Sequence, residues 1–479
     1  MLYALFALLA IILVFIAIIV IRTLVFTPKA NVTPDADSVS FDTDKAVKSL
    51  CELVKCKTVS YSDHTLEDDH EFSKLIDMLP SLYPKVFDKC TFFMFPDRGL
   101  LFKWEGKKHD NPAVMMEHYD VVPVNEEAWD KPAFDAIIED GVIWGRGTLD
   151  TKVTFNGILS AADHLISEGF VPENDIYFAF SGGEEVNGMG AVHIVDYFEK
   201  NKIDLAFVVD EGGAVVENVF PGVKAPCGLI GIAEKGMMNV QYKVKSPGGH
   251  ASAPKPGSPI VALSKAVSKI EDNPFKSHIT PPVAKLFDTL GRHSTFLYRM
   301  IFANLWLFAP VLDMICKKSG GELNALMRTT VAFTQCAGSS AANVIPPEAT
   351  VVSNMRLNPK DNIKKALDYL EKTVDNKNVE ISLIGGMEPS RISRTDCLEY
   401  QKVAAAVSST WGGCLVAPYL MVQCSDSRHY GRISDKVYRF SAMDLTSEER
   451  ATIHGNNERI RIETALRAVE FYIRLMKKC

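Results

Sequence analysis

Three short apolar segments of this chain are each followed closely by histidine or acidic residues, and this arrangement limits the folds that the chain can adopt. The segments are residues 112–117, 175–181 and 204–209, and helix-like stretches at 152–168 and 189–200 alternate with them. This alternation predicts a mostly parallel sheet with covering helices, because parallel strands need a long crossover connection between them. We therefore expect an α/β fold whose polar residues gather at strand ends.

Histidines and carboxylates lie where these predicted strands end or beside glycine turns. Two imidazoles and at least three carboxylates, delivered from separate strand ends, suit a pair of divalent metal ions about 3.5–4 Å apart. The residues concerned are His118, Asp120, Asp150, Glu184, Glu185, Asp210, Glu211 and His454. This pattern predicts a two-metal amide hydrolase.

Each of these residues also has an ordinary structural interpretation. A histidine outside a motif is more often structural than a ligand. Asp150 could be a plain helix N-cap, because aspartate is favoured there. The adjacent acids Glu184 and Glu185 could be solvated loop residues. The surrounding sequence favours the functional interpretation.

Longer blocks around these residues resemble the aminoacylase and carboxypeptidase family of di-zinc metallopeptidases. The blocks include HYDVVPVNEEAWDKPAFDAIIEDGVIWGRGTLDTK, FAFSGGEEVNGMGA, VVDEGG, SPGGHASAP and IHGNNERI, in family order from about Ala113 to the C-terminus. The block RTTVAFTQCAGSSAANVIPPEATVVSNMR and the upstream NLWLFAP are most similar to the branch of Gly-X carboxypeptidase and N-acyl amino acid synthase/hydrolase. The resemblance implies cleavage of a peptide or N-acyl amide bond next to a free carboxylate.

The resemblance also implies two Zn²⁺ ions, with Co²⁺ or Mn²⁺ as alternatives, and a role for each polar residue. Asp150 would bridge the ions, Asp120 would orient His118, and Glu184 would be the general base. The implied zinc ligands are His118, Asp150, Glu185, Asp210 and His454. Other family members carry a glutamate after the third strand, so Glu211 stays open as an alternative to the predicted Asp210.

Four further residues are implied to bind substrate. His250 in SPGGHASAP resembles the residue that stabilises the oxyanion, often across a dimer interface. Asn343, Arg356 and Arg428 resemble groups that hold the substrate carboxylate, to which a guanidinium fork is suited.

A region with a different pattern separates two parts of the predicted catalytic domain, 43–237 and 386–479. Residues 238–385 show the order β-α-β-β-α-β, which predicts a ferredoxin-like unit. The resemblance implies that this unit is a lid and that it mediates a homodimer. Within it, Phe296–Ile315 is unusually apolar. This segment is either a packing helix of the lid or a surface for membrane or a lipid acyl chain.

The N-terminus begins with an apolar run from Leu2 to Ile21. A run of this length suits a membrane span of about 20 residues, so we predict a single-pass anchor at residues 1–26 and a linker at 27–42. A cleaved signal peptide is the alternative, although no small-residue cleavage site follows. Arg22 and Lys29 leave the side of the membrane open.

Composition excludes one class of partner. The 479 residues carry a formal net charge of −7 and no long basic tract, so we expect no nucleic-acid binding. The ten cysteines form no CxxC pair and leave the redox compartment open. Two alternatives to a carboxypeptidase or N-acyl amino acid hydrolase are a strict dipeptidase and a non-catalytic, membrane-tethered binding protein.

Overall fold

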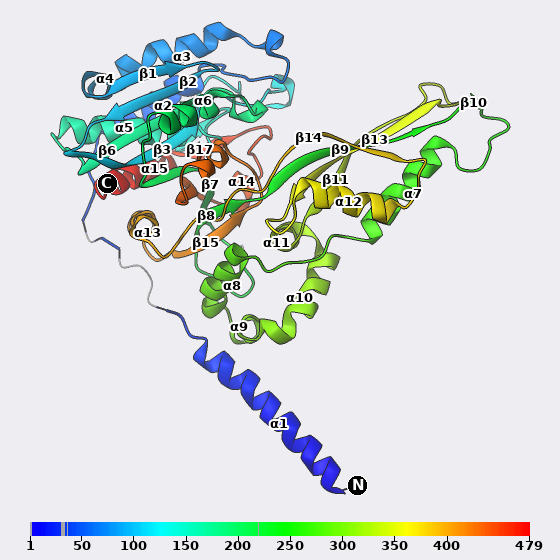
Figure 1. Ribbon diagram of the computed structural model, residues 1–479. Helices are drawn as coiled ribbons and strands as arrows, with labels where there is room; N and C mark the ends of the chain where they lie inside the picture. The colour runs from blue at the N-terminus through cyan, green and yellow to red at the C-terminus, as the bar shows by residue number, and fades with distance from the viewer. Residues whose placement is uncertain (1, 30–33, 36, 219) are drawn as a thin grey trace.

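A large sheet with helices on both faces forms the centre of this protein, as a computed structural model shows (Figure 1). The structure describes residues 2–29, 34–35, 37–218 and 220–479. A second sheet extends to one side, and one long helix leads away from the main body at the N-terminal end.

The main sheet has eight strands in the order β1-β2-β6-β3-β7-β16-β8-β15. Their bounds are β1 (Thr91–Phe95), β2 (Gly99–Trp104), β3 (Lys108–His118), β6 (Asn174–Ser181), β7 (Phe207–Val216), β8 (Cys227–Glu234), β15 (Leu415–Met421) and β16 (Val437–Leu445). Strand β3 lies between β6 and β7 and is parallel to both. The predicted strands at 112–117, 175–181 and 204–209 are thus neighbours, and their ends meet at one edge.

The sheet is mixed, so the prediction of a mostly parallel sheet was too simple. Strand β2 is antiparallel to β1 and β6, and β8 is antiparallel to β7 and β16. Strands β1 and β2 are joined by a short turn at 96–98, and a connection this short can join only antiparallel strands. The parallel part is the centre, where the polar strand ends lie.

Helices cover both faces of this sheet. One face packs against α2 (Thr43–Val54), α5 (Lys152–Ser167), α13 (Leu398–Thr410) and α15 (Ile462–Met476), and the other against α6 (Gly190–Lys200). Shorter elements complete this part: η1 (His64–Leu66), α3 (Asp69–Leu82), α4 (Pro84–Lys89), η2 (Glu126–Ala128), β4 (Ile137–Glu139), β5 (Val142–Trp144), η3 (Glu184–Val186), η4 (Asp426–Arg432), α14 (Ser447–Arg450) and β17 (Arg459–Arg461).

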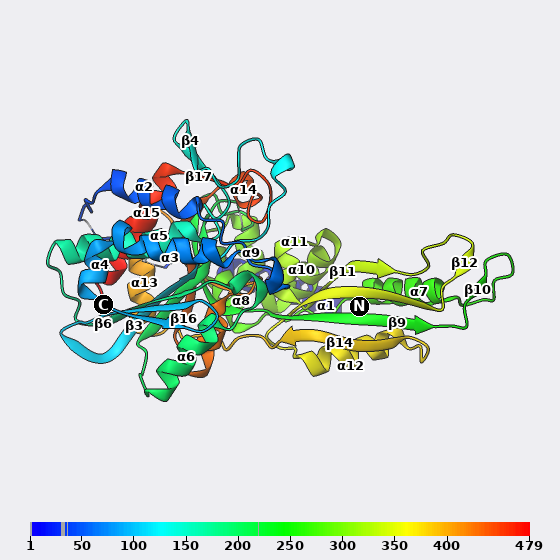
Figure 2. The same ribbon diagram turned by 90° about the horizontal axis from the view of Figure 1, so that it is seen from above.

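The second sheet has the strand order β11-β13-β9-β14 (Figure 2). It has its own apolar core. Its elements are β9 (Gly236–Lys245), α7 (Pro259–Asp272), β11 (Thr330–Ala337), β13 (Glu348–Leu357), α12 (Ile363–Val374) and β14 (Glu380–Met387), with the small pair β10 (Gly249–His250) and β12 (Val344–Ile345) at its far end. In β9 the buried residues alternate with less buried ones, as a sheet with one covered face requires. The boundaries 238–385 and the lid role stay predictions.

Four helices between α7 and β11 differ from the expected packing. They are α8 (Pro281–His293), α9 (Phe296–Ala303), α10 (Leu305–Ser319) and α11 (Gly321–Met327). Their buried residues, among them Phe287, Leu290 and Phe302, join the main core, so Phe296–Ile315 is not a packing helix of the second sheet. Helix α8 lies against β15, an edge strand that needs cover.

Helix α1 (Leu2–Val25) is apolar from Leu2 to Ile21 and almost entirely exposed, with a mean hydropathy of 3.5. Its C-terminal end contacts the rest of the protein, because Thr23 is buried and Arg22 donates hydrogen bonds to the Ala303 carbonyl oxygen. Of the predicted linker, residues 30–33 and 36 lie outside the described part of the chain.

Candidate metal centre

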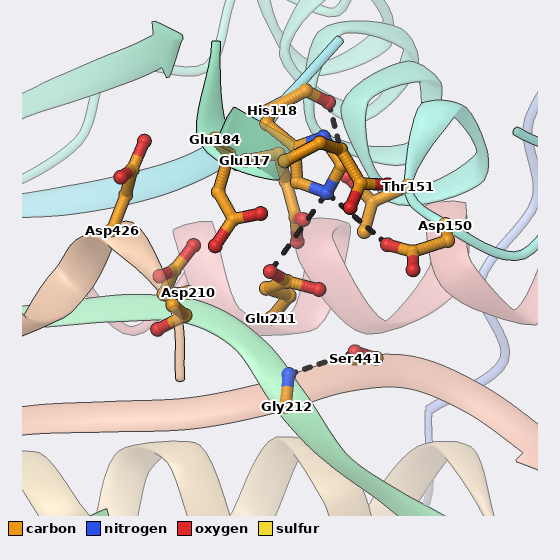
Figure 3. Close-up of polar contacts among 12 residues, drawn as sticks. Glu117, His118, Asp150, Thr151, Glu184, Asp210, Glu211, Gly212, Asp426 and Ser441 are labelled. Atoms are coloured by element: carbon orange, nitrogen blue, oxygen red, sulfur yellow. Dashed lines mark hydrogen bonds and ion pairs between the residues drawn. The ribbon is translucent and has the colours of Figure 1, made fainter. Parts of the chain in front are cut away.

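His118 stands at the end of β3, where the central parallel strands end. Its side chain is 2% exposed, and its Nδ1 lies 3.0 Å from the backbone oxygen of Asp120. Its Nε2 lies 3.1 Å from Asp150 Oδ1 and 3.8 Å from Glu211 Oε1. Figure 3 shows the side chains of Asp150 and Glu211 pointing toward this ring. The contact with Asp120 fixes the ring, so Nε2 is the atom that faces the acids.

Asp150 lies between the two predicted histidine ligands. Its Oδ1 faces His118, and its Oδ2 lies 2.9 Å from His454 Nε2. His454 Nε2 also lies 3.1 Å from Glu185 Oε2. One carboxylate oxygen for each histidine is the arrangement that a bridging ligand needs.

The turn that presents Glu184 and Glu185 is held by Asp120. The carboxylate of Asp120 accepts the backbone N–H of Glu184 at 3.1 Å and that of Glu185 at 3.2 Å, and the hydroxyl of Ser60 at 2.6 Å. Asp120 therefore positions both the His118 ring and the acidic turn.

The structure brings Glu211, not the predicted Asp210, to the cluster. The ligand atoms of His118, Glu184 and Glu211 lie within 4.8 Å of one another, as do those of His118, Asp150 and Glu185. The Asp210 carboxylate instead accepts the backbone N–H of Ser427 at 2.9 Å. Successive residues of a strand point to opposite faces, and here the glutamate faces the histidine.

The electrostatics of the cluster favour a bound cation. Burial raises the pKa of the Glu184, Glu185 and Glu211 carboxyls. Although burial opposes it, hydrogen bonds from His118 and His454 lower the pKa of Asp150. Glu185 Oε1 is buried and has no hydrogen-bond partner in the described part of the chain. Crowded acids with an unpaired buried oxygen fit divalent metal ions, which would supply the missing positive charge.

Sequence reasoning missed Glu458, which positions Asp150. This fully buried carboxylate accepts the backbone N–H groups of Leu149 at 2.7 Å and of Asp150 at 3.2 Å, and it forms an ion pair with buried Arg146. Its place four residues after His454, in the block IHGNNERI, was the available signal.

A cavity of about 400 Å³ opens from the cluster. Asp150, Glu184, Glu185, Glu211 and His454 line one part of it. Apolar side chains of β7, β8, β15 and β16 and of the segment after α14 line much of the rest, together with polar residues such as Glu322, Gln423 and Arg450. The apolar side chains include Val216, Leu229, Met421, Met443, Leu445 and Ile453.

Two of the predicted substrate-binding residues lie beside this cavity. Arg428 Nη2 lies 3.8 Å from Glu184 Oε1, and its side chain is 11% exposed. Arg356 Nη1 lies 3.4 Å from the sulfur of Cys424, which lines the cavity.

The other two lie at the far end of the second sheet. His250 is in β10, and the Asn343 carbonyl oxygen accepts the backbone N–H of Ala251 nearby. Figure 1 shows β10 at the tip of the sheet, away from the main body. Within this chain, His250 and Asn343 therefore do not join the metal-ligand cluster.

Solved structures with this fold include peptidases. An M20-family metallo-carboxypeptidase from Sulfolobus solfataricus superposes with a TM-score of 0.66 at 20% identity, covering 90% of this chain and 98% of that one. A dinuclear metal-binding peptidase from Bacillus subtilis superposes with a TM-score of 0.57 at 12% identity, covering 91% and 98%. At these identities the likeness establishes the fold alone.

Sequence comparison establishes the family. A probable carboxypeptidase S-like 2 from Dictyostelium discoideum is 34% identical over 473 residues, covering 96% of this chain and 91% of that protein. An N-fatty-acyl-amino acid synthase/hydrolase from Xenopus tropicalis is 34% identical over 477 residues, covering 97% and 92%. The model of Peptidase family M20/M25/M40 matches residues 114–478. This chain therefore belongs to peptidase family M20/M25/M40 and is a metal-dependent amide hydrolase.

Proposed function

We propose that this chain hydrolyses N-acyl amino acids whose acyl group is long and apolar. The observation that carries the proposal is the cavity that leads from the acidic cluster past apolar side chains such as Leu229, Met421 and Met443. An apolar acyl chain gains free energy from burial there, whereas the charged N-terminus of a dipeptide would lose its hydration. The relative from Xenopus tropicalis supports this substrate class.

We propose two Zn²⁺ ions as the metals, held by His118, Asp150, Glu185, Glu211 and His454. Asp150 would touch both ions, since its two oxygens face the two histidines. When bound, the ions would polarise the scissile carbonyl and lower the pKa of water.

Glu184 is the proposed general base. It lines the cavity, and burial raises its pKa, which brings the proton affinity of its carboxylate closer to what a general base needs at neutral pH. In this role it takes the proton from the attacking water and passes it to the leaving nitrogen. Arg428, close to Glu184, and Arg356 hold the free carboxylate of the amino acid.

We further propose a homodimer in which the second sheet supplies His250 and Asn343 to the site of a partner copy. Support comes from their position at the tip of that sheet, away from the cluster of their own chain. Light scattering of the purified protein tests this: a monomeric mass in an active preparation would contradict it.

The N-terminal helix is proposed as a single-pass membrane anchor that stays with the mature chain. Its 24 residues are long enough for a span, and its last turn contacts α9. N-terminal sequencing of the protein from cells tests this. A mature chain that begins after Val25 would identify a signal peptide instead.

An acyl-length series tests the substrate class. Purified zinc-loaded protein is assayed with N-acyl amino acids of one head group and increasing acyl length, with matched dipeptides for comparison. Each buried methylene is worth up to about 0.8 kcal/mol, or about fourfold in kcat/KM. A rise with acyl length is expected, and faster hydrolysis of the dipeptides would contradict the proposal in favour of a dipeptidase.

A further inference from the structure

The corner between α9 and α10 exposes apolar side chains next to α1. The two helices meet at 111°, and on them six large apolar residues are between 45% and 63% exposed. These six residues, together with the turn at 303–305, are the α9–α10 corner: Phe296, Leu297, Trp306, Val311, Met314 and Ile315. A single exposed apolar residue needs no explanation, but a group on one corner indicates a surface with a partner.

Polar contacts attach α1 to this corner. Asn304, between α9 and α10, is fully buried. Its side-chain nitrogen donates to the Ile19 carbonyl oxygen and to the Thr23 hydroxyl, both at 3.3 Å, and its side-chain oxygen accepts from Arg22 at 3.2 Å. Buried polar groups in apolar surroundings require such partners. Helix α1 is therefore held against the corner in a defined position.

The contact continues along α1 into its apolar part. The rings of Phe15 and Trp306 meet edge to face, with centroids 5.7 Å apart. Phe15 precedes Arg22 by seven residues, which is about 10 Å along a helix. Figure 1 shows α9 and the start of α10 beside the upper end of α1. Lipid that surrounds α1 at Phe15 must therefore reach Trp306.

The charges around the corner fit a bilayer surface. Residues 281–320 contain five lysines and arginines and two aspartates, in a chain of net charge −7. Both aspartates are paired, Asp288 with Arg292 and Asp313 with Arg328. Apolar residues flanked by basic ones favour the interface of an anionic membrane.

We propose that the α9–α10 corner is embedded in a lipid bilayer beside α1, so that two elements hold this enzyme on the membrane. The proposal rests on α1 as a membrane span. Lipid is favoured over a second copy of the chain because the apolar side chains of α1 need lipid at the same depth as Trp306.

Tryptophan fluorescence tests the proposal. Trp306 is 56% exposed, whereas Trp104, Trp129 and Trp411 are at most 9% exposed. The full chain is reconstituted into phosphatidylcholine and phosphatidylglycerol vesicles with and without brominated acyl chains, which quench only tryptophan in contact with lipid. We expect brominated lipid to reduce the emission of the wild type, and the reduction to be lost in Trp306→Phe, which keeps a ring against Phe15.

A matched pair of variants provides a second test of the proposal. Met314→Lys places a charge on the corner and should weaken the quenching of Trp306, whereas Leu398→Lys, at a residue equally exposed on α13, should leave it unchanged. Quenching that is the same in wild type and Trp306→Phe overturns the proposed contact between the corner and lipid, whether water or a second copy covers the corner. Flotation with the vesicles is measured in the same samples: a chain that does not float overturns the α1 span as well.

Discussion

His454 Nε2 lies 2.9 Å from Asp150 Oδ2, which joins the C-terminal part of the chain to the loop before α5. The other oxygen of Asp150 faces His118, so this one carboxylate lies between two imidazoles from distant segments. The proposed two-metal centre depends on this carboxylate, because it is the group that lies next to both histidines. Substitutions at Asp150 should therefore have effects that differ from those at neighbouring acids.

Asp150→Ala should lose metal and activity together, because a bridging carboxylate serves both ions. The measurement is metal content by elemental analysis after dialysis, together with hydrolysis of an N-acyl amino acid. Two zinc ions per chain in the variant would contradict the bridge.

Glu184→Gln should keep its metal and lose turnover. The amide preserves the shape of the side chain but cannot accept a proton, and loss of a general base typically costs about 10²–10⁴ in rate. The control is Glu168→Gln, at an exposed position after α5, which should hydrolyse at the wild-type rate. Near-normal hydrolysis by Glu184→Gln would remove the proposed base.

The sequence predicted the centre of the fold better than its edges. Apolar segments that end in His118 or Asp210 could be recognised because central parallel strands are buried on both faces. The antiparallel neighbours β2 and β8 could not, since their direction depends on which strand the chain returns to. The packing of α8 to α11 was also hidden, because an apolar helix pattern does not state which core it joins.

At the site, residue types predicted the chemistry but not every position. Asp210 and Glu211 are adjacent acids, and which one faces His118 depends on the orientation of β7 in the sheet. Glu458 was missed because a buried carboxylate that accepts backbone N–H groups has the same sequence pattern as a surface acid.

Glu211→Gln should reduce metal content more than Asp210→Asn does, because only Glu211 lies with His118 and Glu184. Asp210→Asn keeps an oxygen that can accept the Ser427 N–H. Metal affinity of the two variants, measured by competition with a chelator, distinguishes the residues. A greater loss of zinc in Asp210→Asn would restore the assignment made from family resemblance.

Glu458→Ala should destabilise the protein strongly. Removing one partner of a buried ion pair leaves Arg146 uncompensated, which typically costs about 3–5 kcal/mol, whereas an exposed pair contributes about 0–1 kcal/mol. Glu448→Ala, which breaks the exposed pair with Arg459, is the control. Free energies of unfolding from urea titration give the comparison, and equal losses in the two variants would contradict the role of Glu458.

The metal-free protein should lose stability as pH rises from about 5 to 8, and added zinc should remove this dependence. Burial raises the pKa of Glu184, Glu185 and Glu211 above the ordinary 4.5, and contacts with Asp150 and Glu185 raise the pKa of His454 to about 10, from 6.5. The folded state then binds more protons than the unfolded state over this range, so stability falls as pH rises. Bound cations replace those protons, because metal ligands are deprotonated. Melting temperatures with chelator and with zinc, at half-unit pH steps, give the two slopes. A metal-free protein that becomes more stable toward pH 8 would show that these acids are already ionised in the fold, and that the cluster needs no cation to hold them together.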